Sequence, residues 1–236
     1  MSEKPVLYLL PGLLCDRVVW QHQAAHLADL AEVRIASFYG FDLLSAMAMS
    51  VLADAPARFA VAGHSMGGRV SFEIMRVAAE RVTHLALLDT GVVPAGEGEA
   101  AKRQELIDLA FNEGMTALAA RWLPPMVHPE APVRDPELMR TLTEMVCRAS
   151  PEIYAGQVKA LLHRPDFRPH LGEIRCPTLV GVGRQDGWST VAQHEPIAAA
   201  VPGAELRIYE DSGHMVTMEA AEAVTASLRE WLGRTA

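Results

Sequence analysis

The sequence predicts an α/β protein in which a mostly parallel sheet of about six strands carries helices on both faces. Short apolar runs alternate with stretches whose apolar residues recur at helical spacing. Runs such as LALL and TLVGV are apolar at nearly every position, as strands buried on both faces are. The 236 residues, 50% of them hydrophobic, also suffice for one large domain with a sizeable core.

The predicted elements follow one another along the chain in this alternating order. Strands are predicted at residues 6–10, 33–36, 59–62, 85–88, 178–182 and 205–209, where aliphatic and β-branched residues gather. Helices are predicted at residues 17–30, 43–53, 67–79, 191–201 and 220–232 from the spacing of their apolar residues. Because a strand-helix-strand unit joins parallel strands, this order favours a parallel sheet.

One long segment interrupts the alternation. Between residues 94 and 172 there is no strand pattern, and amphipathic stretches are separated by proline-rich joints such as LPP and HP. These stretches cover residues 102–112, 115–122, 136–149 and 152–162. We therefore predict a core domain made of residues 1–93 and 173–236, with residues 94–172 inserted as a helical lid over the ligand crevice at the end of the sheet. A purely structural helical subdomain is the alternative interpretation.

The composition argues against several classes of partner. The formal net charge is −8 and Lys or Arg runs are absent, so binding to nucleic acid or anionic membranes is not expected. The apolar stretch at residues 6–14 is broken by a Pro-Gly pair and lacks a cleavage site, which indicates a strand and loop rather than a signal peptide. Three cysteines without metal-ligand spacing favour reduced thiols in a cytoplasmic protein. The expected partner is a small-molecule substrate.

The stretch GHSMGG at residues 63–68 places a serine between a predicted strand and a predicted helix. At so sharp a turn Ser65 is expected to take a positive φ, and Gly63 and Gly67 leave room because they have no side chain. The helix that begins there offers N–H groups and a dipole that favour negative charge. By itself the pattern G-x-S-x-G is weak evidence for a nucleophilic serine. Its position after a predicted strand makes this evidence stronger. The glycine-rich phosphate-binding motifs do not occur in the sequence.

An activated serine needs a base, and the base needs an acid that orients it. His214 follows the last predicted strand, and Asp186 follows the strand before it. Both positions lie at the carboxyl edge of the sheet, where Ser65 also lies, so we predict a Ser65–His214–Asp186 triad. Two other carboxylates remain open as the acid. They are Asp89, at the end of the fourth strand, and Asp211, three residues before the histidine.

Five stretches along nearly the whole chain resemble landmarks of the α/β-hydrolase family. They are LPGLL at 10–14, GHSMGG at 63–68, LLDT at 87–90, GRQD at 183–186 and SGHM at 212–215. The resemblance implies an acyl-enzyme on Ser65 and an oxyanion hole made by the backbone N–H groups of Leu13 and Met66. The chain departs from the family at Pro11-Gly12, where many members have His-Gly. It also lacks the N-terminal strand pair of many members, which is why six strands rather than eight are expected.

The sequence thus predicts a serine hydrolase, an esterase or lactonase without cofactor or metal, that cleaves a small carboxylic ester or lactone. Trp122, Trp188 and Met215 are predicted to bound the substrate pocket, with simple core packing as the alternative. The lid resembles that of 3-oxoadipate enol-lactonases, and its few basic residues that could hold a second carboxylate are Arg121, Arg134, Arg140 and Arg148. The same fold leaves other functions open. They are acyl transfer or peracid synthesis, hydrolysis of a carbon–carbon bond, and ligand binding by a receptor that turns over no substrate.

Overall fold

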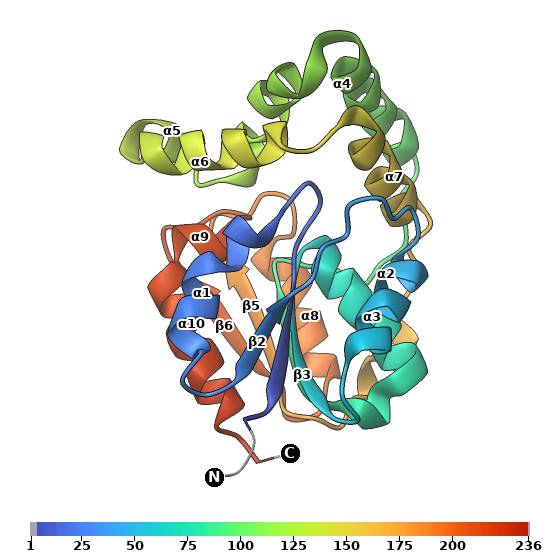
Figure 1. Ribbon diagram of the computed structural model, residues 1–236, viewed down its shortest axis with the longest axis vertical. Helices are drawn as coiled ribbons and strands as arrows, with labels where there is room; N and C mark the ends of the chain where they lie inside the picture. Colours follow the sequence, from blue (N-terminus) through green and yellow to red (C-terminus); the bar gives the residue numbers. More distant parts are fainter. Residues whose placement is uncertain (1–3, 236) are drawn as a thin grey trace.

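The computed structural model describes residues 4–235, and its centre is a six-stranded sheet with the order β2-β1-β3-β4-β5-β6 (Figure 1). The strands are β1 (Val6–Leu10), β2 (Glu32–Ile35), β3 (Phe59–His64), β4 (Val82–Leu88), β5 (Thr178–Gly183) and β6 (Glu205–Tyr209). Every neighbouring pair is parallel. The predicted α/β class is confirmed, and the sheet is wholly rather than mostly parallel.

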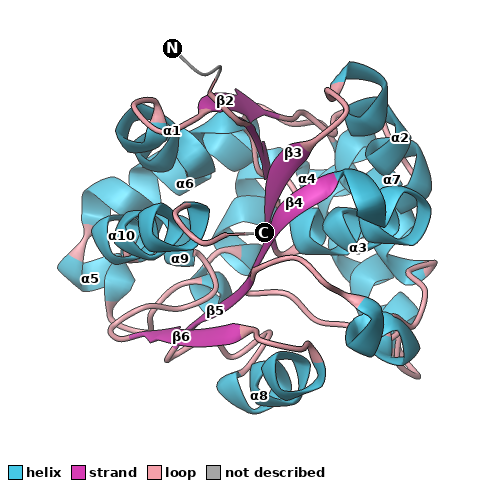
Figure 2. Ribbon diagram, turned by 90° about the horizontal axis from the view of Figure 1, so that it is seen from below, coloured by secondary structure: helices cyan, strands magenta, loops and turns pink. Residues whose placement is uncertain are grey.

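Helices cover both faces of the sheet. On one face lie α1 (Gln21–Leu27) and α10 (Ala221–Leu232), and on the other lie α2 (Leu44–Asp54), α3 (Met66–Ala78) and α8 (Val191–Ala200) (Figure 2). Strands β1, β3 and β5 are buried at every position, whereas the edge strands β2 and β6 are mostly half-buried. Double coverage is the reason that the central strands carry continuous apolar runs.

One of the predicted helices is subdivided, and two short helical elements were not predicted separately. The segment predicted at 17–30 forms a 3-10 turn, η1 (Arg17–Trp20), followed by α1. The side chain of Asp16 accepts a hydrogen bond from the N–H of Val18 at 2.9 Å and caps this turn. A short α9 (Val216–Glu219) precedes α10, and Ala220 between them is non-helical, with φ −120° and ψ 40°. A second 3-10 turn, η2 (Ala79–Arg81), extends α3.

All the regular elements between β4 and β5 are helices. It forms α4 (Glu99–Trp122), η3 (Pro124–Met126), α5 (Ala131–Arg134), α6 (Pro136–Cys147), α7 (Pro151–Leu162) and η4 (Arg168–Glu173). Figure 1 shows α4 to α7 above the carboxyl ends of the strands. This is the place at which the lid is predicted, and the division into a core and a lid domain stays a prediction.

Local signals determine where the lid helices bend and begin. Gly114, with φ 85° and ψ 175°, kinks α4 between the two stretches that the sequence separates. The side chains of Asp135 and Ser150 accept hydrogen bonds from the N–H groups of Leu138 and Ile153, and a proline follows each cap. Long as α4 is, no helix within residues 4–235 has the length and apolar character that crossing a bilayer requires.

Candidate active site

Ser65 lies at the turn between β3 and α3 with φ 53° and ψ −114°. Its N–H donates to the carbonyl oxygen of Leu88 at 2.8 Å. Its own carbonyl oxygen accepts from the N–H of Gly68 at 3.0 Å and from the hydroxyl of Thr90 at 2.8 Å. A positive φ is unfavourable for a residue with a Cβ, so these bonds hold a strained turn in place. The turn exposes the serine hydroxyl to a cavity.

The glycines around Ser65 are required by close backbone contacts. A Cβ on Gly63 would overlap the backbone of Gly67 and Gly68, and a Cβ on Gly67 would overlap the carbonyl oxygen of Leu10. Strand β1 therefore passes so close to the start of α3 that no side chain fits between them. This close approach agrees with the steric reason expected from the sequence.

Replacing Gly67 with alanine should lower the free energy of unfolding by at least about 3 kcal/mol, because the new Cβ has to displace the backbone of β1. In a domain of this size the loss corresponds to a fall of roughly 6–12 °C in Tm. Differential scanning fluorimetry measures it. Gly96→Ala is the matched control, because a Cβ there meets no atom within 4 Å. Equal Tm values for the two variants would contradict the steric requirement.

His214 joins the serine to a carboxylate. It lies in the loop between β6 and α9, and its side chain is buried. Its Nε2 is 2.8 Å from Ser65 Oγ, and its Nδ1 is 2.8 Å from Asp186 Oδ2. Because a carboxylate only accepts, Nδ1–H donates to Asp186, and Nε2 is left to accept the serine hydroxyl proton. The three predicted side chains thus meet within hydrogen-bonding distance.

Asp186 is held by the loop that follows β5. Its Oδ1 accepts hydrogen bonds from the N–H groups of Trp188 and Ser189, both at 2.8 Å. Burial opposes its ionisation, but the charge and hydrogen bond of His214, together with the two N–H donors, lower the pKa of Asp186 below its usual value. The group is therefore an ionised acceptor at neutral pH.

The two alternative acids lie elsewhere. Asp89 is fully buried at the end of β4, and its carboxylate accepts from the N–H groups of Gly183 at 2.9 Å and Val216 at 3.3 Å. Burial, followed by the charge of Asp186, raises the pKa of Asp89 well above its usual range. Asp211 is exposed. The carboxylate that contacts the imidazole of His214 is that of Asp186.

A second histidine supports the backbone of the first. His64, the last residue of β3, donates from Nε2 to the carbonyl oxygen of His214 at 2.7 Å. Burial, followed by the charge of His214, lowers the pKa of His64 to about 3, so its ring is neutral. It positions the loop that carries His214.

Glu219 is a supporting residue that the sequence analysis missed. Its carboxylate accepts from the N–H groups of Gly213 at 2.9 Å and Met215 at 3.3 Å, on either side of His214. It also accepts from the N–H of His128, in the lid, at 2.6 Å. A glutamate five residues after the histidine, at the end of a one-turn helix, is the only sequence signal for this role.

The predicted oxyanion donors lie on both sides of the serine. Gly12, in the loop after β1, is so close that a Cβ on it would lie 3.2 Å from Ser65 Cβ. Leu13 follows it and lines a small cavity together with Ser65. Met66 is the first residue of α3, where the N–H groups of a helix point at bound negative charge. Their role as donors stays a prediction.

The loop after β1, which carries the predicted oxyanion donor Leu13, is held by a lid residue that the sequence did not indicate. Leu14 has φ 59°, and its N–H donates to Gln157 Oε1 at 2.8 Å. The Nε2 of the same glutamine donates to the carbonyl oxygen of Phe38 at 3.2 Å. Gln157 belongs to α7 and is fully buried. The shape of the loop therefore depends on the lid.

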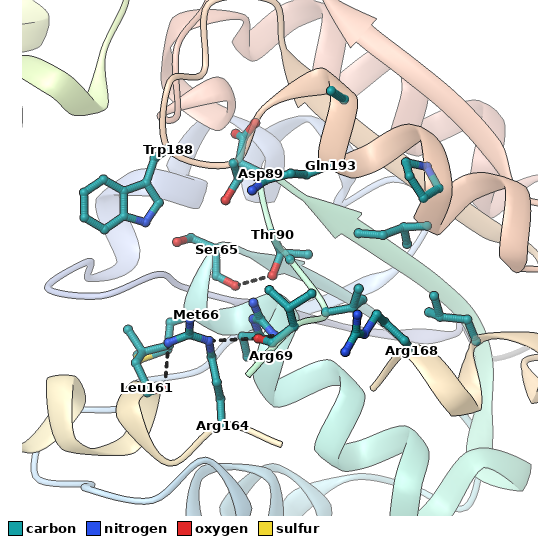
Figure 3. A pocket seen from close by; sticks show the side chains of 18 of the residues that line it. Ser65, Met66, Arg69, Asp89, Thr90, Leu161, Arg164, Arg168, Trp188 and Gln193 are labelled. Atoms are coloured by element: carbon teal, nitrogen blue, oxygen red, sulfur yellow. Dashed lines mark hydrogen bonds between the residues drawn. The ribbon is translucent and has the colours of Figure 1, made fainter. Parts of the chain in front are cut away.

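A cavity of about 710 Å³ opens beside Ser65 (Figure 3). A smaller one, of about 20 Å³, lies between the serine, His214 and the lid. Trp188 lines both cavities, and Trp122 and Met215 line the smaller one. Each residue predicted to bound the substrate thus borders a cavity next to the serine. In residues 4–235 no group of three or more His, Cys, Asp or Glu side chains is arranged to hold a metal ion.

The basic residues of the large cavity differ from the expected ones. The lid arginines named from the sequence line neither cavity. Arg134 donates to the carbonyl oxygen of Asp211, while Arg140 and Arg148 pair with acidic side chains on the surface. The arginines that line the large cavity are Arg69, Arg103, Arg164 and Arg168. The first of these lies four residues after Ser65, a spacing that the sequence could have revealed.

Fold, strained serine turn and Ser-His-Asp geometry together define an α/β hydrolase. Residues 7–227 match the sequence profile of the alpha/beta hydrolase family, and the chain belongs to this family.

Two solved structures and one curated relative are similar to this chain. The esterase of Thermogutta terrifontis has a TM-score of 0.88 at 27% identity, over 98% of this chain and 90% of that one. The enol-lactonase of Burkholderia xenovorans LB400 has a TM-score of 0.87 at 27% identity, over 99% and 93%. The acetyltransferase component of the acetoin cleaving system of Pseudomonas putida is 32% identical over 175 residues, or 73% of this chain. The chain spans less than half, 45%, of that relative.

Proposed function

We propose that this hydrolase cleaves a small carboxylic ester or lactone through an acyl-enzyme, with Ser65 as nucleophile, His214 as base and Asp186 as the orienting acid. The observation that carries the proposal is the pair of 2.8 Å hydrogen bonds joining the three side chains. The similarity to an esterase and to an enol-lactonase supports this substrate class.

His214 takes up and gives back a proton in each of the two halves of the reaction. Ser65 Oγ attacks the acyl carbon while its proton passes to Nε2 of His214, and Asp186 stabilises the resulting imidazolium. The oxyanion accepts hydrogen bonds from the backbone N–H groups of Leu13 and Met66, and a donor of this kind contributes about 2.7–4 kcal/mol. His214 then protonates the leaving alkoxide. Water, deprotonated by the same imidazole, attacks the acyl-enzyme; the bond to Ser65 Oγ then breaks, His214 returns the proton to this oxygen, and the acid leaves.

The dimensions of the site support a substrate of modest size. The cavity of about 710 Å³ is within the range that small-molecule sites occupy. Trp188 forms part of its wall, and Trp122 and Met215 close the smaller cavity beside His214. A small molecule is also the partner that the composition predicts. Cytoplasmic location and the lack of a cofactor stay predictions from the sequence.

A serine-directed fluorophosphonate tests the proposal. It should label the protein once, and peptide mass spectrometry should place the adduct on Ser65, because this hydroxyl lies 2.8 Å from the imidazole of His214 and borders a cavity. The labelled protein should lose all activity on a panel of esters and lactones, with p-nitrophenyl acetate as reference. An adduct on another residue would contradict the proposal. Labelling of Ser65 without product release from any substrate would identify a ligand receptor instead.

A further inference from the structure

The large cavity concentrates positive charge in an acidic protein. The chain carries a net charge of −8, yet four arginines line the cavity. The carboxylates in its wall are those of Glu99 and Asp89. Burial of Asp89, followed by the charge of Asp186, raises the pKa of Asp89 and so disfavours its negative charge. The cavity therefore holds an excess of positive charge beside the serine.

Three of the four arginines have carboxylate partners. Glu99 lies between Arg103 and Arg164, at 2.8 Å from the first and 2.6 Å from the second. Burial opposes its ionisation, but hydrogen bonds from Arg164 and Arg103 lower the pKa of Glu99 to about 2. Arg168 pairs with Asp166 at 2.5 Å. Glu99 thus compensates the charge of only one of its two arginine partners, and Asp166 compensates that of Arg168.

Arg69 has no such partner. Its Nη1 donates to the carbonyl oxygen of Val93 at 2.9 Å, and within residues 4–235 it forms no ion pair. Burial, followed by the charge of Arg164, lowers the pKa of Arg69 to about 9, so it is still a cation at neutral pH. A half-buried cation without a counter-ion can gain from an anionic ligand, because it has already lost part of its hydration. A Cβ on Gly91 would lie 2.9 Å from its Nη2, so the glycine leaves space for the guanidinium.

Arg69 is placed one helical turn from the nucleophile. It follows Ser65 on α3 by four residues, or about 6 Å along the helix axis, and its N–H donates to the carbonyl oxygen of Ser65 at 3.3 Å. Both residues line the large cavity. In Figure 3, Arg69 and Arg164 lie on the side of the cavity opposite Trp188. A substrate held at the serine by its carbonyl carbon therefore has the guanidinium in the wall of the same cavity.

The position of the base indicates which part of the substrate faces Arg69. His214, which must protonate the leaving alkoxide, lines the small cavity and is not among the described residues that line the large one. Ser65 lines both. The leaving oxygen therefore faces His214, and the large cavity is the space into which the acyl part can extend.

We propose that Arg69 binds a carboxylate at the far end of the acyl group, so that the preferred substrates are half-esters or lactones of short dicarboxylic acids. The inference rests on the proposed hydrolase function and adds the class of its substrate. A guanidinium suits this ligand because it offers a carboxylate two parallel N–H donors.

Two aryl esters with the same leaving group test the proposal. They are mono-p-nitrophenyl adipate, which carries a free carboxylate, and its neutral methyl ester. The wild-type enzyme should show the higher kcat/KM on the anionic ester after subtraction of spontaneous hydrolysis. Arg69→Met should reduce the ratio of the two kcat/KM values by about 10- to 100-fold, as expected for a lost charge-assisted hydrogen bond. Arg69→Lys should retain part of the ratio, because it keeps the charge.

Two further variants separate the charge of Arg69 from other effects. Arg121→Met removes the same charge from an exposed position that lines neither cavity, and it should leave the ratio unchanged. Gly91→Ala keeps the charge but displaces the guanidinium, and it should lower the ratio. Thermal melts of all variants show whether they are folded. A wild-type preference for the neutral ester, or an equal loss on both esters in Arg69→Met, would overturn the proposal.

A binding experiment tests the carboxylate subsite independently of catalysis. Calorimetry on the Ser65→Ala protein compares adipate with the neutral adipamide. Adipate should bind more tightly, and adding Arg69→Met should weaken its binding at least about tenfold. If the wild type cleaves neither ester, the hydrolase function fails and this measurement alone decides on the subsite. Equal affinities for the two probes would then refute it.

Discussion

Replacing Ser65 with alanine should lower kcat for p-nitrophenyl acetate by about 10⁴- to 10⁶-fold. The change removes the one hydroxyl that lies 2.8 Å from the base, His214 Nε2. It leaves untouched the backbone hydrogen bonds of the turn to Leu88, Gly68 and Thr90. Tm should therefore stay within about 4 °C of the wild-type value. Release of p-nitrophenolate and a thermal melt measure the two quantities.

Ser71→Ala is the matched control for this experiment. Ser71 is also buried on α3, but its hydroxyl donates to the carbonyl oxygen of Gly67 and lines neither cavity. Its loss removes one hydrogen bond, worth about 0.5–1.5 kcal/mol of stability, and kcat should change by no more than about threefold. Residual activity above about 1% in Ser65→Ala would exclude the serine as nucleophile.

Replacing Asp186 with asparagine should lower kcat by about 10⁴-fold with little change of fold. The carboxylate accepts from Nδ1–H of His214, which leaves Nε2 free to take the serine proton. An amide N–H at that position favours the tautomer with the proton on Nε2, and that tautomer cannot act as the base. Steady-state hydrolysis of p-nitrophenyl acetate measures the loss.

Asp89→Asn tests Asp89, one of the two alternative acids, against Asp186. Asp89 accepts from the N–H groups of Gly183 and Val216, and an amide supplies only one acceptor oxygen for these two donors. The variant should lose about 1–3 kcal/mol of stability but keep kcat within about tenfold. A loss of kcat as large as that of Asp186→Asn would assign the acid to Asp89.

Much of the fold was predictable because the parallel sheet is covered on both sides. Double burial demands apolar residues at every position, so β5 and the other central strands stand out in the sequence. Elements of a single turn, such as α5 (Ala131–Arg134), are too short to show a helical period and were missed. The one-turn helix α9, which precedes the predicted helix 220–232, was missed for the same reason.

The order of the sheet also made the Ser-His-Asp geometry predictable. Ser65, Asp186 and His214 each follow a strand, and parallel strands end at one edge, so their meeting point follows from topology. The charged wall of the cavity was not predictable in this way. Arg164 and Glu99 pair across 65 residues of lid, and only the packing of α7 against α4 brings them together.

Two sets of hydrogen bonds connect the lid to the loops that carry the proposed catalytic groups. Gln157 of α7 accepts from Leu14 beside the predicted oxyanion donor, and Glu219 joins the lid backbone at His128 to Gly213 beside the base. A movement of the lid away from the sheet would therefore have to break these hydrogen bonds and free both loops. Grafting a foreign lid onto this scaffold to redirect its selectivity would therefore succeed only if both sets of hydrogen bonds were transplanted with it.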